Sequence, residues 1–167
     1  MEEKLLSGLL TVCGLLQKHG VKYLVVGGAA VALNGYFRQS VDATGALVER
    51  PDVDIWYDPT YENYFNLLKV MKELGQEVLA FEKEQIPNPH QSFFKLSFSD
   101  FTLDLLPQIK ANFKFYEAER QKNTVEIEGI PIYSLSIADL IEDKQATARH
   151  KDLEDIEMLK KRRDEEA

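Results

Sequence analysis

The chain has 167 residues, of which 44% are apolar and 29% charged, values typical of an ordinary globular protein of one domain. They exclude a disordered tail, a collagen and a coiled-coil rod, and the net charge of −8 disfavours broad nonspecific binding to nucleic acid. The single cysteine, Cys13, excludes an intramolecular disulfide and a cysteine-based zinc site. No apolar run has membrane-spanning length and no basic segment precedes the first apolar residues, so we expect a cytoplasmic protein with no membrane partner.

Helices and strands alternate in the first half of the predicted fold. Leu5, Leu9, Val12 and Leu16 recur at helical spacing, and Gly20 ends that helix. The predicted elements are a helix over Glu3–His19, a strand over Val21–Val26, a helix over Ala29–Leu33, an irregular stretch over Tyr36–Pro51, a strand over Asp52–Asp58 and a helix from Pro59-Thr60 to Gly75.

The second half is predicted to hold short strands and then helices. The predicted elements are strands near Glu77–Phe81, Ser92–Phe98 and Phe101–Leu106, a hairpin of Thr124–Ile127 with Ile130–Tyr133, a helix from Ser136 and a last helix from about Asp152. This order predicts a mixed α/β or α+β fold in a single domain, with an α/β core over about 1–133 and C-terminal helices over about 134–167.

Three aspartates on two predicted strands form the sharpest candidate site. Asp52 and Asp54 stand two residues apart and therefore project from the same face of their strand. Asp104 faces away from its apolar neighbours on another strand, where a lone buried acid would need a partner. If the strands are neighbours, the three carboxylates can hold one or two divalent ions. The alternative is that the acids line a solvated face or guard an edge strand.

Two glycines separate a predicted strand from a helix. Gly27 and Gly28 permit a close approach of the backbone, and the start of a helix favours anions, so this turn can hold a phosphate. It lacks the third glycine of a dinucleotide fingerprint and the Gly-Lys-Ser/Thr of a Walker loop. A simple tight turn is the alternative.

The glycine pair before a helix, the Asp-x-Asp on the next strand and the later aspartate in an apolar strand resemble, in this order, the nucleotidyltransferase superfamily with the polymerase-β-like fold. The similarity is greatest to its minimal bacterial members, the AbiEii-type toxin nucleotidyltransferases. The stretches that carry it are Tyr23–Ala30, Asn34–Arg38, Asp52–Trp56, Leu135–Ile141 followed by Lys144, and Arg149–Ile156.

The resemblance implies a role for each matching residue. Asp52 and Asp54 would be metal ligands, and Asp104 the third acid, which also orients or deprotonates the attacking hydroxyl group. The implied nucleotide- and phosphate-binding residues are Gly27, Gly28, Arg38, Lys144 and Asp152. The implied cofactor is Mg²⁺ or Mn²⁺, and the implied partners are a nucleoside triphosphate, an acceptor and a cognate antitoxin or other partner protein.

The chain departs from the family pattern between the arginine and the acids. The family usually runs from the arginine almost directly into its Asp-x-Asp, whereas here an insertion over Thr44–Arg50 intervenes. Asp42 is the alternative first ligand, but it has no acid two residues on. The C-terminal residues also have alternative interpretations: Lys144 can reach out to solvent, and Asp152 can cap the last helix.

The expected function is therefore Mg²⁺-dependent transfer of a nucleotidyl group from a nucleoside triphosphate to a hydroxyl acceptor. The acceptor stays open between an RNA end, a protein side chain and a small molecule. The alternative function is a non-catalytic nucleotide-binding or toxin–antitoxin partner module with the same fold.

Overall fold

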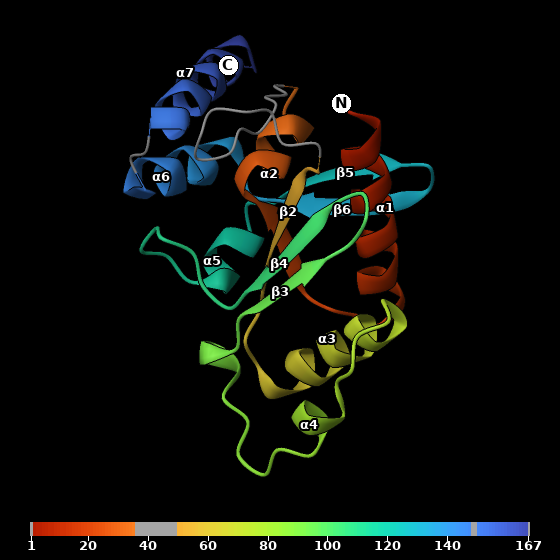
Figure 1. The fold of residues 1–167 in the computed structure, drawn as a ribbon. Coiled ribbons are helices and arrows are strands. Elements are labelled where there is room, and N and C mark those ends of the chain that lie inside the picture. Colours follow the sequence, from red (N-terminus) through yellow and green to blue (C-terminus); the bar gives the residue numbers. More distant parts are fainter. Residues whose placement is uncertain (1, 36–49, 148–149, 167) are drawn as a thin grey trace.

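A six-stranded mixed sheet in the order β3-β4-β2-β1-β6-β5 forms the centre of the computed structural model, which describes residues 2–35, 50–147 and 150–166 (Figure 1). Arg38, Asp42 and most of the inserted loop lie outside the described residues. The strands are β1 (Tyr23–Val26), β2 (Asp52–Tyr57), β3 (Phe94–Ser97), β4 (Thr102–Leu106), β5 (Asn123–Ile127) and β6 (Ile130–Ser134). The helices are α1 (Glu3–Lys18), α2 (Gly27–Leu33), α3 (Tyr61–Glu73), α4 (Leu79–Glu82), α5 (Phe115–Glu119), α6 (Ile137–Thr147) and α7 (His150–Glu166), with a 3₁₀ turn at Pro89–Gln91.

The sheet combines parallel and antiparallel pairs around its central strands. β2 runs antiparallel to β1 and parallel to β4, while β1 runs parallel to β6. The outer pairs β3–β4 and β5–β6 are antiparallel. This sheet with its helices confirms the predicted mixed α/β fold class.

The two faces of β2 differ in chemistry, and this difference positions the candidate site. Val53, Ile55 and Tyr57 are buried on the face that α1 and α3 cover, and Figure 1 shows these two helices together on one side of the sheet. Asp52 and Asp54 point to the opposite face, as their spacing predicts. β2 therefore buries one face in the core and presents its acids on the other.

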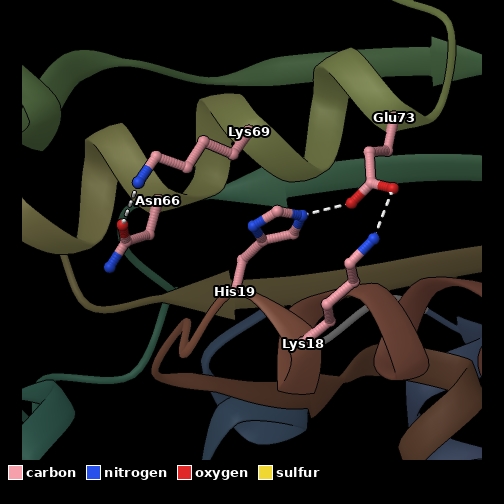
Figure 2. Close-up of polar contacts among 5 residues, drawn as sticks. All are labelled: Lys18, His19, Asn66, Lys69 and Glu73. Carbon is pink, nitrogen blue, oxygen red and sulfur yellow. Dashed lines mark hydrogen bonds and ion pairs between the residues drawn. The ribbon is translucent and has the colours of Figure 1, made fainter.

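Polar contacts at the periphery join α1 to α3. Glu73 near the end of α3 accepts a hydrogen bond from Lys18, with 2.8 Å between Lys18 Nζ and Glu73 Oε1, and its other oxygen contacts His19 (Figure 2). On the same helix Lys69 Nζ lies 3.4 Å from Asn66 Oδ1. These groups are mostly exposed, so the buried apolar side chains contribute most of the stability of this helix pair.

Local signals explain several element boundaries. The hairpin turn is as predicted: Glu128 and Gly129 have φ angles of 52° and 78°, the left-handed pair that a two-residue hairpin turn requires. α3 begins after Thr60, whose side chain accepts the amide of Asn63 at 3.3 Å. Asp139 donates its amide to the hydroxyl of Ser136 at 3.1 Å, which caps the start of α6.

One predicted strand is wrong. Residues 77–81 hold no strand; the short helix α4 begins at Leu79 instead. The apolar run from Val78 to Phe81 is too short for its periodicity to distinguish a strand from a helical turn, and Leu79 is exposed rather than paired. None of the helices in the described ranges is long and apolar enough to cross a membrane.

Candidate active site on the acidic face of the sheet

Asp54 and Asp104 lie side by side at the centre of the candidate site. Their strands are parallel neighbours, and the two residues are directly paired in the register of β2 and β4. Burial, together with the negative charges of Asp104 and Asp52, raises the pKa of Asp54 to about 7. Burial also raises the pKa of Asp104, while the charge of Lys95 on β3 acts in the opposite direction. The proximity of the two carboxyl groups therefore favours a proton on Asp54.

Asp52 completes the predicted acidic group at a more exposed position. It is paired in register with Thr102, whose hydroxyl donates a hydrogen bond to its carboxylate. Its charge contributes to the raised pKa of both Asp54 and Asp104. Within the ranges that the structure describes, no three His, Cys, Asp or Glu side chains surround a single point as metal ligands do. The three acids share a face and an electrostatic field, and their function as one metal site stays a prediction.

The glycine turn lies directly against the acid pair because of strand register. Val26, the last residue of β1, pairs with Asp54, so Gly27 follows immediately beside that carboxylate. Gly27 has a φ of 65°, and a Cβ atom there would stand 2.5 Å from Oδ2 of Asp54. Glycine is therefore required by both the backbone and the space. Gly28 is exposed, and a Cβ on it would meet nothing within 4 Å.

A cavity of about 570 Å³ opens in front of these residues, within the range typical of small-molecule sites. Four of the sequence-predicted residues line it: Gly27, Asp54, Lys144 and Asp152. The lining residues that the sequence did not single out include His90, Gln91, Phe93 and Asp143. The structure thus brings the start of α2, the centre of β2 and the facing sides of α6 and α7 around one space.

Lys144 is buried in an ion network rather than extended into solvent. Only 5% of the residue is exposed, and its Nζ lies 3.3 Å from Asp152 Oδ1 and 3.1 Å from Asp155 Oδ2. Asp152 also accepts a hydrogen bond of 2.7 Å from the hydroxyl of Thr147. The alternative in which Lys144 reaches out to solvent is therefore wrong. The positive charge of Lys144 opposes the rise in the pKa of Asp54, so the network and the acid pair interact electrostatically.

Two acids near the cavity, Asp143 and Asp155, were not identified as candidate site residues from the sequence. Asp143 accepts the backbone amides of Lys110 and Ala111, both at 3.1 Å, and burial raises the pKa of its carboxyl. Asp155 is fully buried beside Lys144. The available signal for Asp155 is its spacing of three from Asp152, which places both acids on one helix face. Asp143 has no comparable signal, because its partners are backbone amides far away in sequence.

The chemistry of the acid pair fits a divalent cation. Oδ1 of Asp104 is buried and makes no hydrogen bond within the described part of the chain. A buried oxygen without a donor is costly unless a cation or a ligand donor approaches it. Carboxylate oxygens are the ligands that Mg²⁺ prefers in proteins, so Asp52, Asp54 and Asp104 are the residues that could hold it.

The sheet, its helices and the acids placed at its centre form a nucleotidyltransferase fold. The solved structure of the antibiotic-resistance factor ANT(2'')-Ia matches 95% of this chain and 84% of its own, with a TM-score of 0.60 and 18% identity. The lincosamide antibiotic adenylyltransferase LnuA, bound to lincomycin, matches 96% of this chain and 97% of its own, with a TM-score of 0.58 and 18% identity. An antigenic nucleotidyltransferase-like protein from Paracoccidioides brasiliensis matches 95% of this chain and 76% of its own, with a TM-score of 0.53 and 16% identity.

No family model matches the sequence, and no curated protein matches it. At the low identities of the solved structures the likeness establishes the fold, and arguments about activity have to come from the side chains of the site. The polymerase-β-like fold expected from the resemblance is confirmed. The closer likeness to AbiEii-type members stays a prediction.

Proposed function

We propose that this protein is a nucleotidyltransferase that moves a nucleotidyl group from a nucleoside triphosphate to the hydroxyl group of an acceptor. The observation that carries the proposal is the pairing of Asp54 with Asp104 beside Gly27, at the edge of a cavity of about 570 Å³. Two adjoining carboxyl groups with raised pKa values are costly for the fold, and such costs gather at functional sites. Such a pair of acids can hold the divalent ions that align a nucleotide and a hydroxyl group for in-line attack.

The residues divide the chemistry between them. The acceptor oxygen forms a bond to the α-phosphorus, the bond from that phosphorus to the bridging oxygen breaks, and pyrophosphate leaves. Asp104 orients the acceptor hydroxyl and takes its proton, for which the buried Oδ1 offers an acceptor. Asp52, Asp54 and Asp104 would hold Mg²⁺, which would neutralise the charge of the phosphates. The open side of Gly28 leaves room for a phosphate to approach the backbone.

Lys144 and Asp152 have different roles in this proposal, although the sequence predicted phosphate binding for both. The ammonium group of Lys144 lies between Asp152 and Asp155 and lines the same cavity as Asp54. We propose that it attracts nucleotide phosphates while its acidic partners hold it in place. Asp152 then acts as a positioning residue and does not touch the nucleotide.

A small molecule is the acceptor that we favour. The acidic net charge of −8 opposes a long nucleic acid. Among the solved structures with this fold, the antibiotic-resistance factor ANT(2'')-Ia has also been solved in complex with adenylyl-2''-tobramycin, and LnuA is a lincosamide antibiotic adenylyltransferase. LnuA is an adenylyltransferase and ANT(2'')-Ia binds an adenylylated antibiotic, so ATP is the first nucleotide to test.

The test combines thermal melting with a transfer assay using α-labelled ATP and acceptor panels of hydroxyl-bearing small molecules, RNA and protein. We expect Mg²⁺ and ATP together to raise the melting temperature of the wild type, because a bound ligand stabilises by mass action. Label should pass to an acceptor in the wild type and in the control Asp100→Asn, an exposed acid outside the site. It should not pass in Asp54→Asn or Asp104→Asn.

Three results would count against the proposal. Full transfer by Asp54→Asn would remove this acid from the catalytic centre. Stabilisation by the nucleotide without transfer to any acceptor class would favour the non-catalytic binding module. A melting temperature that does not change with any nucleoside triphosphate and Mg²⁺ would mean that the protein does not bind nucleotides.

A further inference from the structure

A second cavity of about 640 Å³ adjoins the one that contains Asp54. The two cavities share a wall formed by His90 and residues 107–110, which follow β4. The catalytic side of the wall faces Asp54 and Lys144, and the other side faces Trp56 and α5. A compound in the second cavity would therefore lie next to the reacting groups without occupying the nucleotide's space.

The shared wall is anchored to the rest of the fold. Asp143 of α6 accepts hydrogen bonds from the amides of Lys110 and Ala111, both at 3.1 Å. From the opposite side, the indole Nε1 of Trp56 donates to the carbonyl oxygen of Pro107 at 3.2 Å. These bonds fix both ends of the segment, so the second cavity is a built feature of the fold.

Aromatic rings form the apolar part of this second cavity. Trp56 packs against Phe115 with ring centroids 5.2 Å apart and against Phe113 at 6.2 Å. Tyr116, on the next position of α5, is 58% exposed and borders the same space. An exposed aromatic ring beside a buried aromatic cluster offers a flat surface on which a sugar or aromatic ring can stack.

The charges around this cavity differ from those of the whole molecule. Lys110 and Lys114 line it, and Asp58 is the one carboxylate among its described lining residues. The chain as a whole carries a net charge of −8. A compound with several positive charges would meet more ammonium than carboxylate here, which disfavours it.

We infer that the second cavity is the acceptor subsite, and that it takes a ring-bearing hydroxyl compound without positive charge. The ring stacks on Tyr116 and its neighbours, and the hydroxyl group reaches past the shared wall into the cavity that contains Asp54. That the bound compound is an acceptor rests on the proposed function. Binding of such a compound can be tested without any nucleotidyl transfer.

The test uses Trp56, the only tryptophan of the chain, as a fluorescent reporter at the cavity. The probes are phenyl β-D-glucopyranoside as the neutral compound, phenyl β-D-glucuronide as its anionic counterpart and spermine as the polycation. We expect saturable fluorescence changes with both glycosides and none with spermine. Tyr116→Ala should weaken glycoside binding about 2- to 10-fold, the loss expected for one stacking ring. Tyr61→Ala is the matched control, because Tyr61 is 60% exposed and does not border this cavity.

The outcomes separate this inference from the proposed function. Glycoside binding that persists with saturating Mg²⁺ and ATP supports a subsite distinct from the nucleotide's, whereas competition with ATP overturns it. No saturable change with either glycoside, or an equal loss in Tyr61→Ala, overturns the subsite even if nucleotide binding is intact. Saturable binding of spermine overturns the charge preference. If glycosides bind but no nucleotide does, the proposed function fails and the ring-binding cavity stands.

Discussion

Asp54 is the residue at which stability and function make opposite demands. The fold places it beside Asp104 with little access to water, so its ionised form is disfavoured. A divalent cation would reverse this preference, because it requires the anion. Single substitutions at this position can therefore separate the two demands.

We predict that Asp54→Asn stabilises the metal-free protein at alkaline pH. The pKa of Asp54 rises from its ordinary 3.8 to about 7 in the fold, so the folded state holds this proton more tightly than the unfolded state. Its contribution to the free energy of unfolding is therefore full below about pH 4 and falls as the pH rises through 7. Asparagine should remove this loss and gain roughly 2 kcal/mol at pH 8, about half of the full shift, because its amide group is polar and still loses water on burial.

The measurement is chemical denaturation of both proteins at pH 5 and pH 8 in the presence of a chelator. The difference between variant and wild type should be clearly larger at pH 8. If the variant and the wild type differ in free energy of unfolding by the same amount at pH 5 and pH 8, the pKa of Asp54 is not raised by burial and its acidic neighbours.

The two glycines of the turn should respond differently to substitution. Gly27→Ala combines a positive φ with a contact of 2.5 Å to Asp54, so it should destabilise the fold by roughly 1–3 kcal/mol. A Cβ atom at position 28 meets no atom within 4 Å, so Gly28→Val should leave stability nearly unchanged while it weakens nucleotide binding. Melting temperature and nucleotide affinity are measured together for both variants. If Gly28→Val loses stability and keeps its affinity, the pair is only a tight turn.

At the scale of elements, the sequence predicted the strands that carry the acids because apolar and acidic residues alternate there. The hairpin was equally accessible, since Glu128-Gly129 has local turn chemistry. Helix α5 was missed because its single turn has too few residues for a period, and residues 77–81 were assigned to a strand for the same reason. Local patterns thus identify long or strongly alternating elements.

Contacts between distant elements could not be predicted in this way. The sequence placed Lys144 on an apolar helix face but gave no means to choose between solvent and a buried anion. The choice depends on how α7 packs against α6 and brings Asp152 and Asp155 to the ammonium group. The same holds for the anchoring of residues 110 and 111 by Asp143, which depends on tertiary structure alone.

We predict that Lys144→Met destabilises the protein by roughly 3–5 kcal/mol. Methionine fills nearly the same volume but removes the cation that lies between two fully buried carboxylates. Lys72→Met is the control, because Lys72 is exposed on α3. Unfolding by denaturant, followed by circular dichroism, gives both values. Equal stability of the two variants would show that the buried network contributes nothing to the packing of α6 on α7.

At the scale of the whole molecule, the site depends on segments from every part of the chain. The turn after β1, the centre of β2, the end of β4 and the facing sides of α6 and α7 all border the cavity that contains Asp54. The mixed sheet brings them together because β2 lies between β1 and β4. We propose that this arrangement binds a nucleoside triphosphate through a divalent cation.

Nucleotide binding is measured by calorimetric titration of the protein with each nucleoside triphosphate, first with Mg²⁺ and then with a chelator. We predict saturable binding of at least one nucleoside triphosphate that requires Mg²⁺ and that weakens at least about tenfold in Asp54→Asn. Binding that is as strong in the chelator, or the absence of binding by any of the nucleotides with Mg²⁺ to folded wild-type protein, would contradict it.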